Sequence, residues 1–307
     1  MPFTKEHKLV IAVASSALFD LSESDKVYRE HGDEAYRIFQ EKNIDVPLAK
    51  GVAFPFIRRI LNLNNAFHEQ QPVEVVLMSR NSTETGMRVF RTIQHYSLDI
   101  TKASFFSGKS PYEYLPAFGV SLFLSANADD VRNAIKAGYA AGRVLVADIE
   151  DDETDSNLRL AFDFDGVLAD DAAETVYKTT HDLQKFHEFE TTQSTIPHNA
   201  GPLKDLLYKI SFFQKLETEK LATDKNYNRL LNISLITARC SPSHERVVST
   251  LKSWGISVDQ AFFLGGEKKS KILEILKPHM YFDDQITHLE HVDNIPLVHI
   301  PFGIANK

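Results

Sequence analysis

Short apolar segments alternate along the chain with longer amphipathic segments, and this alternation restricts the fold more than any other feature. Strands and helices that alternate in this way are typical of α/β proteins with mostly parallel sheets. Parallel strands are buried on both faces, so they read as continuous apolar runs. The predicted strands are Leu9–Ala14, Val73–Met78, Ala103–Phe106, Val120–Leu124, Leu158–Phe162, Ile233–Ile236, Ala261–Leu264, Met280–Phe282 and Leu297–His299. The helical patterns between them include Glu84–His95, Asp129–Ala137, His244–Trp254 and Lys271–Leu276.

The chain has 307 residues, a length that suits two domains of ordinary size. The acidic stretch Asp148–Asp155 is predicted to link a first α/β domain at 1–150 to a second at 151–307. A charged loop inside one domain would have the same composition and is the alternative. A mostly helical insertion at about 170–231 is predicted to cap the second domain.

The two halves of the chain resemble each other in the order and spacing of their landmarks. Leu9–Phe19 parallels Leu158–Leu168, and Val76–Ser79 parallels Ser234–Thr237. Self-similarity at matched offsets predicts the duplication of one α/β unit. The alternative is that any two α/β units share some strand-helix spacing.

Only the second half carries acidic residues at the landmark positions. They are Asp163, Asp165 and Asp283, and the first half has Ala14, Ser16 and Ser125 in their places. Carboxylate chemistry is therefore predicted for the second half alone. The first half is predicted to be a degenerate α/β repeat that supports or covers its partner.

The charge and cysteine content exclude some classes of partner. The net charge is -8, and nucleic-acid backbones repel such a surface, so DNA or RNA is not expected as a partner. The single Cys240 cannot form an internal disulfide and gives no sign of an oxidising compartment. Lys5 and Lys8 precede the apolar run Leu9–Val13, a pattern that mimics a signal peptide, but a buried first strand is favoured. No apolar run is long enough to span a bilayer, so no membrane association is predicted.

Two carboxylates follow the predicted strand Leu158–Phe162. Residues two apart point the same way, so Asp163 and Asp165 project together where the strand ends. In open α/β sheets, ligands bind at this carboxyl end. Two adjacent acids repel each other unless a cation lies between them, and Mg²⁺ prefers such oxygen ligands. An Asp-x-Asp pair alone is a weak signal, because a solvated turn often contains one.

Three further elements follow other predicted strands. Thr237 and the adjacent backbone N–H groups of Ala238 and Arg239 are candidates to hold a phosphate oxygen, with a helix N-cap as the alternative. A lysine after Leu264-Gly265-Gly266 is a candidate to neutralise phosphate, and the choice among Lys268, Lys269 and Lys271 is open. The pair Asp283-Asp284 is a natural metal anchor, and either residue can be the ligand.

The joint order Asp-x-Asp, Thr, Lys, Asp-Asp resembles that of the haloacid dehalogenase-like phosphohydrolases. The resemblance implies a Rossmann-type parallel sheet with a helical cap. It implies that Asp163 is the nucleophile and that Asp165 protonates the leaving alcohol and then activates water. Thr237 and Lys269 would hold the phosphoryl oxygens. Asp163, the Asp165 carbonyl and one of Asp283 or Asp284 would hold Mg²⁺.

Longer strings over most of the chain resemble the cytosolic 5'-nucleotidase type I family. They are Ala53–Phe56, Val75–Ser79, Gly201–Lys204, Leu235–Arg239, Ser253–Gly255 and Pro278–Gln285. The resemblance implies Mg²⁺-dependent hydrolysis of nucleoside 5'-monophosphates, AMP above all, in the cytoplasm. The family often has Gly between the two acids, whereas this chain has Phe164, a difference that leaves both acids in place.

Residues for the nucleoside are harder to identify from the sequence. Phe186 and Phe189 are candidates to stack on the base and Lys204 to reach the substrate, although core packing and a surface turn are the alternatives. Arg80 and Asn81 follow a first-half strand and are candidates to bind the nucleoside or an effector, or else they cap a helix. Arg239 either orients the Thr237 loop or pairs with a surface acid. Four of the histidines lack zinc-type spacing with Cys or His partners and are predicted to be structural or surface groups. They are His95, His181, His187 and His288.

Two other functions use the same residues. A phosphatase for another small ester, such as a sugar phosphate, would need the same four elements and a different cap. A non-catalytic nucleotide sensor would not need the complete set of acids, Thr and Lys. The sequence leaves base preference open, and it does not decide whether the chain forms a homo-oligomer.

Overall fold

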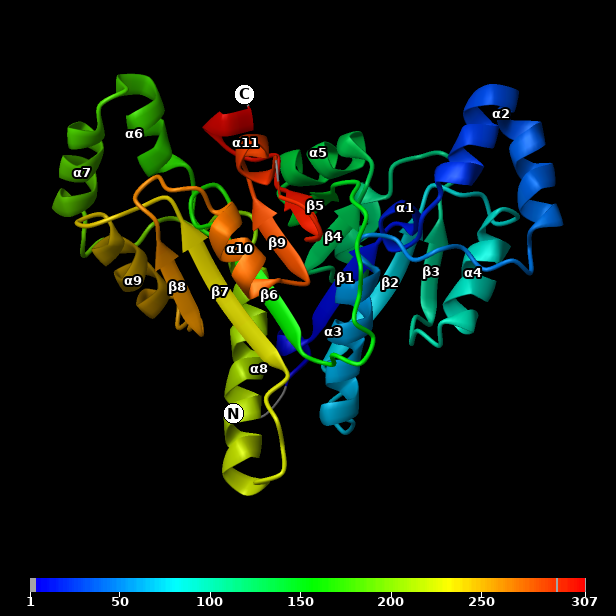
Figure 1. Ribbon diagram of the computed structural model, residues 1–307, viewed down its shortest axis with the longest axis horizontal. Helices are drawn as coiled ribbons and strands as arrows, with labels where there is room; N and C mark the ends of the chain where they lie inside the picture. The colour runs from blue at the N-terminus through cyan, green and yellow to red at the C-terminus, as the bar shows by residue number, and fades with distance from the viewer. Residues whose placement is uncertain (1–3, 291, 307) are drawn as a thin grey trace. The chain divides into compact units, whose positions relative to one another are not determined.

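The computed structural model describes residues 4–290 and 292–306, which form two compact α/β units that divide between Tyr139 and Ala140 (Figure 1). The units divide earlier than the expected boundary at residue 150. The reason is the strand β5 (Ala141–Val144), which the sequence analysis did not predict. It pairs antiparallel with β10 (Leu297–His299) and therefore belongs to the second unit.

The first unit contains a parallel sheet with the strand order β3-β2-β1-β4. Its strands are β1 (Leu9–Val13), β2 (Val73–Ser79), β3 (Lys102–Phe105) and β4 (Leu122–Ser125). Its α-helices are α1 (Ser15–Leu18), α2 (Ser22–Lys42), α3 (Phe54–Ala66), α4 (Gly86–His95) and α5 (Ala128–Lys136). The N-terminal apolar run is the fully buried strand β1, so the prediction of a strand there is confirmed.

The second unit contains a sheet with the order β8-β7-β6-β9-β10-β5, in which only the β10–β5 pair is antiparallel. Its other strands are β6 (Leu158–Phe162), β7 (Leu231–Thr237), β8 (Gln260–Phe263) and β9 (Met280–Asp283). Its α-helices are α6 (Ala172–Thr180), α7 (Leu183–Thr192), α8 (Lys204–Thr223), α9 (His244–Ser253), α10 (Ser270–Leu276) and α11 (Ile286–Leu289). The alternation of apolar runs and helices therefore predicted an α/β fold with mostly parallel strands correctly.

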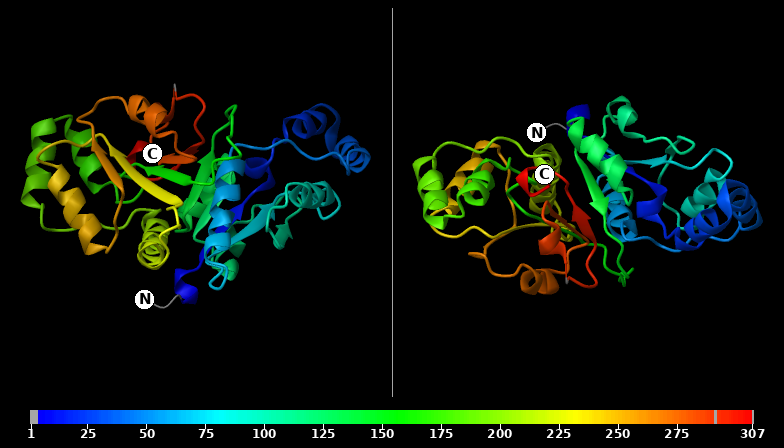
Figure 2. Two further views of the ribbon diagram at one scale, coloured as in Figure 1. Left: turned by 60° about the horizontal axis from the view of Figure 1, so that its bottom comes forward. Right: turned by 90° about the horizontal axis from the view of Figure 1, so that it is seen from above.

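The helices between β6 and β7 have two different surroundings. The helix α8 is tied to the start of β7 and the turn before β8, because Glu217 accepts a 2.6 Å hydrogen bond from Leu230 N and Gln214 donates to Asp259 at 2.7 Å. The helices α6 and α7 instead lie beyond the end of β7, and Figure 2 shows this pair apart from α8 in two further views. Within the region 170–231 that was expected to form a cap, α6 and α7 are therefore the helices at the carboxyl end of β7.

The turn that follows the first strand has the same geometry in both units. In the first, Phe19 pairs with Lys50 as an antiparallel bridge, and in the second, Ala169 pairs with Ala200. The next residue in each unit is a glycine, at 51 and 201. A side chain at Gly201 would lie 2.8 Å from the carbonyl carbon of Ala169, so only glycine fits without backbone movement.

No helix in the described part of the chain combines the length and the apolar character that a membrane span requires.

Candidate active site

The four predicted elements meet at the carboxyl edge of the second sheet. Asp163 follows β6, and its backbone N–H donates to Phe282 O at 2.8 Å. The registers Phe162 with Leu235 and Phe162 with Phe282 place β7 and β9 on either side of β6. Parallel strands end at a common edge, so the segments around residues 163, 237 and 283 leave the sheet side by side.

Lys269 lies between two carboxylates of this site. Its Nζ is 2.9 Å from Asp163 Oδ1 and 2.7 Å from Asp283 Oδ2. Burial opposes the charge of Lys269, but the two carboxylates outweigh burial and raise its pKa. Lys268 and Lys271 are exposed. The structure therefore brings Lys269, and neither of the other two lysines, to the acids.

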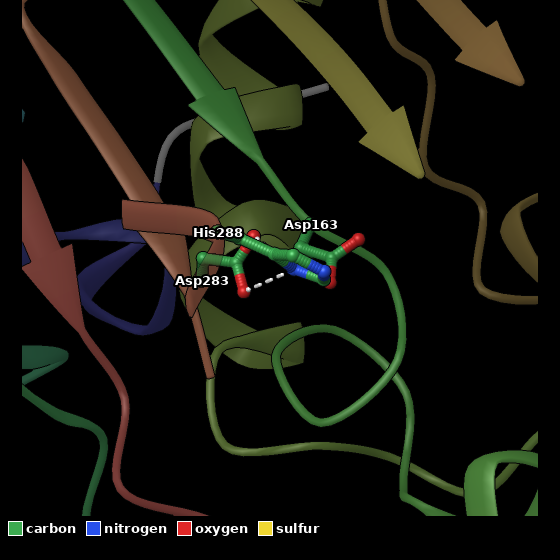
Figure 3. A group of neighbouring side chains, drawn as sticks. All are labelled: Asp163, Asp283 and His288. Carbon is green, nitrogen blue, oxygen red and sulfur yellow. Dashed lines mark hydrogen bonds and ion pairs between the residues drawn. The ribbon is translucent and has the colours of Figure 1, made fainter. Parts of the chain in front are cut away.

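Asp283 is buried and saturated with protein partners. Its Oδ2 accepts from Lys269 and from the Tyr281 hydroxyl, and its Oδ1 accepts from Gln285 N at 2.9 Å. His288 Nδ1 lies 3.2 Å from the same Oδ1 (Figure 3). Burial raises the pKa of Asp283, but Lys269 and His288 lower it by more, so the net shift is downward. His288, expected to be a structural or surface group, thus borders the site.

Asp284 has the opposite environment. It is fully buried, and within the described residues neither of its carboxylate oxygens has a hydrogen-bond partner. A side chain at Gly166 would lie 2.5 Å from Asp284 Oδ2, so this carboxylate packs against the turn that follows Asp163 and Asp165. Burial and the nearby charges of Asp163 and Asp283 raise its pKa.

This arrangement fits a metal ion. A buried carboxylate without a partner is costly unless a cation compensates it. Carboxylate oxygens are ligands that hard divalent cations accept. Asp163, Asp283 and His288 also have atoms close enough to share an ion, but both oxygens of Asp283 already have donors. The unpartnered oxygens of Asp284 make it the better candidate.

Thr237 and Ala238 form the end of β7 and the loop after it. Thr237 is buried, and its Oγ1 accepts from Arg239 N at 3.3 Å. Ala238 is exposed, and its carbonyl accepts from Gly266 N at 2.9 Å. The N–H groups of this loop thus adjoin the edge where Asp163 lies.

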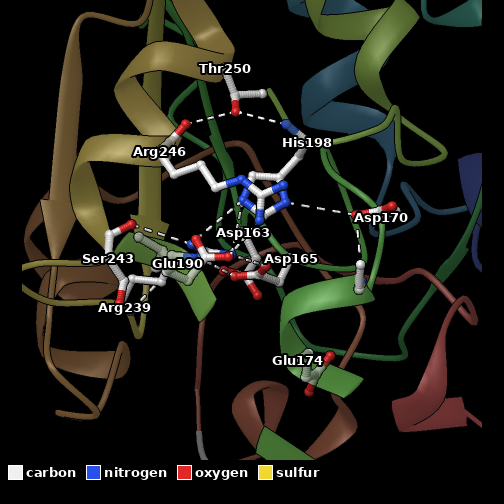
Figure 4. A network of polar contacts seen from close by, with 12 residues as sticks. Asp163, Asp165, Asp170, Glu174, Glu190, His198, Arg239, Ser243, Arg246 and Thr250 are labelled. Atoms are coloured by element: carbon white, nitrogen blue, oxygen red, sulfur yellow. Dashed lines mark hydrogen bonds and ion pairs between the residues drawn. The ribbon is translucent and has the colours of Figure 1, made fainter. Parts of the chain in front are cut away.

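Arg239 forms a bidentate pair with Asp165. Its Nε donates to Asp165 Oδ2 and its Nη2 to Oδ1, both at 2.7 Å. Its Nη1 donates to Glu190 of α7 (Figure 4). The sequence left open whether this side chain orients the Thr237 loop or pairs with a surface acid. The structure instead pairs it with Asp165, an acid of the site itself.

Glu190 is the centre of a buried polar network that the sequence analysis did not identify. It accepts from Arg239 and, at 2.8 Å, from Arg246 of α9. His198 Nε2 lies 3.4 Å from Glu190 and its Nδ1 lies 3.7 Å from Asp170. Polar residues in a helix such as α7 are normally read as a solvated face. No local signal in the sequence marks Glu190 as buried.

The network shifts the pKa values of its members. Burial raises the pKa of Glu190, but hydrogen bonding to His198 and the charge of Arg239 dominate and lower it to about 2. Burial lowers the pKa of His198, but contacts with Asp170 and Glu190 dominate and raise it. The structure therefore favours an ionised Glu190.

Glu174 of α6 is a second buried acid near the site. Its Oε1 accepts from Gln285 Nε2 at 2.8 Å, and Lys178 Nζ lies 3.0 Å from it. Within the described residues its Oε2 has no hydrogen-bond partner. Burial, opposed by Lys178, raises its pKa.

The residues predicted for the nucleoside are in mixed environments. The ring of Phe186 packs on Arg239 at 5.5 Å and that of Phe189 on Arg246 at 5.5 Å, so each has one face on a guanidinium. Lys204 starts α8 and pairs with Asp205 at 3.0 Å. These contacts do not bring the three side chains to a common point.

Arg80 and Asn81 lie at the carboxyl edge of the first sheet, after β2. Arg80 forms a bidentate pair with the buried Asp130, at 2.9 and 2.6 Å. Asn81 accepts from Ser79 Oγ at 2.9 Å. Both side chains are therefore bound within their own unit.

Comparison with known proteins gives a consistent result. A family model described as 5'-nucleotidase matches residues 1–307. The chain is 34% identical over 295 residues to the human protein named cytosolic 5'-nucleotidase 1B, an alignment that covers 94% of this chain and 48% of the human protein. The chain thus spans about half the length of this curated relative. No solved structure matches.

Proposed function

Because the chain belongs to the 5'-nucleotidase family, we propose that it hydrolyses nucleoside 5'-monophosphates, AMP above all, to nucleoside and phosphate. The observation that carries this proposal is the grouping of Asp163, Lys269, Asp283 and Asp284 at one buried sheet edge. Such a group matches a phosphate ester, because a buried cation and a nucleophilic carboxylate lie together. The human relative is named cytosolic, which supports the cytoplasm as the compartment.

The reaction is proposed to run through an aspartyl-phosphate. A carboxylate oxygen of Asp163 attacks phosphorus, and the bond from phosphorus to the 5'-oxygen breaks. Asp165 donates a proton to the leaving oxygen, so the nucleoside departs as an alcohol. Asp165 then accepts a proton from water as the water attacks phosphorus, and this step releases phosphate and regenerates Asp163.

Lys269 and the loop after β7 are proposed to bind the phosphoryl group. The ammonium of Lys269 is next to the Asp163 nucleophile and can interact with the oxygens that gain charge in the transition state. Thr237 Oγ1 and the N–H groups of Ala238 and Arg239 are at the end of the adjacent strand. Groups fixed before the substrate arrives lose little free energy to reorganisation.

We propose Mg²⁺ as the cofactor, with Asp163, Asp284 and the backbone carbonyl of Asp165 as its protein ligands. Bound there, it would neutralise charge on the phosphoryl oxygens and on the acids. Asp284 is preferred over Asp283 because its two oxygens lack protein partners within the described residues, whereas those of Asp283 are occupied.

The helices α6 and α7 are proposed to form the cap that selects the leaving nucleoside. Glu190 ties α7 to the catalytic edge through Arg239. The half-buried Phe186 and Phe189 remain candidates for contact with the base, as does Lys204 at the start of α8. Arg80 and Asn81 are proposed to have only an accessory role in nucleotide binding, because both side chains already form hydrogen bonds within the first unit.

We also infer that the first unit is a degenerate repeat of the second. The strand orders β3-β2-β1-β4 and β8-β7-β6-β9 have the same succession. One side-chain contact in the first unit also corresponds to one in the second. Thr92 Oγ1 accepts from Leu48 N at 3.1 Å, and Thr250 Oγ1 accepts from His198 N at 3.0 Å.

A buried arginine adds a third correspondence. Arg88 Nε donates to Val46 O at 2.9 Å, and Arg246 Nε donates to Ile196 O at 2.8 Å. Matching side-chain hydrogen bonds to the backbone are difficult to obtain from strand spacing alone, so they support duplication. The repeat lacks the acids, which supports a structural or covering role for it.

Phosphate release from AMP, IMP, dCMP and a sugar phosphate, with Mg²⁺, tests the proposal. We expect turnover of the nucleotides, and Asp163→Asn should reduce kcat by at least about 10³-fold because it removes the nucleophile. Hydrolysis of the sugar phosphate alone would refute the substrate class. Nucleotide binding without phosphate release would instead indicate a sensor.

A further inference from the structure

We propose that Arg239 is a positioning residue whose guanidinium orients the carboxylate of Asp165 and does not bind substrate. This inference rests on the proposed function, because it assigns a role within that reaction. The two 2.7 Å hydrogen bonds hold both oxygens of Asp165 in one plane with the guanidinium. A bidentate pair fixes both the position and the rotation of a carboxylate, which a single contact does not.

Every nitrogen of Arg239 already has a partner within the protein. Nε donates to Asp165, Nη1 donates to Glu190 and to Ser243 O at 3.3 Å, and Nη2 donates to Asp165 and lies 3.3 Å from His198 Nε2. The side chain is only 2% exposed. A guanidinium donates hydrogen bonds and accepts none, so Arg239 offers little to a phosphate or a base in this arrangement.

Two aromatic rings pack against the guanidinium. Its central carbon lies 5.4 Å from the ring centre of Phe164 and 5.5 Å from that of Phe186. Phe164 is the residue between the two catalytic acids, and it is fully buried. The unusual Phe at this position therefore supports the arginine that holds the second acid.

The first unit shows that the fold does not require this pair. Asn81 occupies the position that Arg239 has in the second unit, since Asn81 N donates to Ser79 Oγ at 3.2 Å as Arg239 N donates to Thr237 Oγ1 at 3.3 Å. Gln40 likewise takes the place of Glu190, because it accepts from Arg88, the first-unit arginine that corresponds to Arg246. The unit without catalytic acids thus has neutral residues in both places. The charged residues Arg239 and Glu190 therefore occur in the unit that has Asp165, and the α/β unit can be built without them.

The pairing is compatible with both halves of the proposed turnover. As a carboxylate, Asp165 keeps a second lone pair on each oxygen for water. When it carries a proton, one oxygen still accepts from Arg239. Orientation of the acid can therefore persist, and its loss should slow the chemical steps without weakening substrate binding.

A double-mutant cycle with Arg239→Gln and Asp165→Asn tests the proposal, with kcat and KM for AMP measured in saturating Mg²⁺. We expect Arg239→Gln to lower kcat by about 10²-fold with KM within about twofold, because the acid is misplaced and the substrate contacts remain. In the Asp165→Asn background the same change should have no further effect. Arg239→Lys should recover only part of kcat, since lysine cannot form the bidentate pair.

Two controls separate positioning from folding. Arg88→Gln removes a buried arginine of the first unit and should leave kcat unchanged. If Arg239→Gln is unfolded at the assay temperature, Glu190→Gln replaces it in the cycle, because Glu190 holds Nη1 of the same guanidinium. The inhibition constant of inorganic phosphate should be unchanged in each folded variant.

The proposal is overturned if Arg239→Gln raises KM or the phosphate inhibition constant while kcat is preserved, or if the two substitutions act additively. A wild-type chain that hydrolyses some other phosphomonoester but no nucleoside monophosphate would refute the proposed substrate class. The cycle, measured with that other ester, would still decide the role of Arg239.

Discussion

Lys269 Nζ lies 2.9 Å from Oδ1 of Asp163, the proposed nucleophile. The two residues come from segments separated by more than a hundred positions in the chain, and both are almost fully buried. A buried ammonium at this distance compensates the carboxylate and is available to phosphoryl oxygens. This contact is the basis of the first prediction.

Replacing Lys269 by Gln should remove activity and destabilise the protein. The change leaves Asp163 and Asp283 buried without their shared cation, a loss of roughly 3–5 kcal/mol for a broken buried pair. We expect kcat for AMP to fall by at least about 10²-fold. The exposed neighbour Lys268 offers the matched control, and Lys268→Gln should preserve both kcat and the melting temperature. Equal effects of the two variants would exclude the assigned role.

Asp283 and Asp284 should respond differently to substitution by Asn. Mg²⁺ at about 100 times its Kd should stabilise the wild type by about 2.7 kcal/mol, which differential scanning calorimetry would detect. Asp284→Asn should abolish this shift and leave the metal-free protein equally or more stable, because it removes an uncompensated buried charge. Asp283→Asn should destabilise the metal-free protein, since it disturbs the contacts to Lys269 and Tyr281. A full Mg²⁺ shift in Asp284→Asn would show that the ligand is another residue.

Gly201→Ala should destabilise the protein more than Gly138→Ala. Gly138 has φ +84 and open space around it, so alanine there costs about 1–2 kcal/mol of backbone strain. At Gly201 the new methyl would meet the backbone of Ala169 and Val167, which cannot move without disturbing the turn after β6. Urea denaturation would measure both free energies of unfolding. If Gly201→Ala lowers the free energy of unfolding by less than Gly138→Ala does, the turn after β6 can move to accept a methyl group.

The Glu190–His198 network should stabilise the protein most between about pH 4.5 and 6.5. The pKa of Glu190 is lowered from 4.5 to about 2, so its contribution is present above pH 4.5 and is lost as the pH falls. The pKa of His198 is raised from 6.5, so its contribution is present below that value and is lost as the pH rises through the folded-state pKa. His198→Gln should therefore lower the melting temperature more at about pH 5.5 than at about pH 8.5. The same replacement at the exposed His31 is the matched control, and it should leave the melting temperature almost unchanged because that side chain is exposed to solvent.

The sequence predicted the elements that local patterns encode. The bounds of β6 and β10 agree with the predicted Leu158–Phe162 and Leu297–His299, because a buried parallel strand is a continuous apolar run. The strand β5 was missed because four residues, Ala141–Val144, pair antiparallel with a distant strand and carry no such run. The sequence did not separate α8 from α6 and α7, because the apolar positions of α8 do not reveal what they pack against.

By itself, the sequence determined which residues stand at the ends of the strands, and so it placed Asp163, Asp165, Thr237 and the Lys and Asp-Asp groups at one sheet edge. Strand order and chain direction suffice for that, since parallel strands share an edge. Only the tertiary structure decided which member of each group faces inward. Neighbouring residues such as Asp283 and Asp284 differ in their partners because each side chain is surrounded by different, distant segments. The same holds for Arg239 and Glu190, whose burial and pairing depend on helix packing that no local spacing encodes.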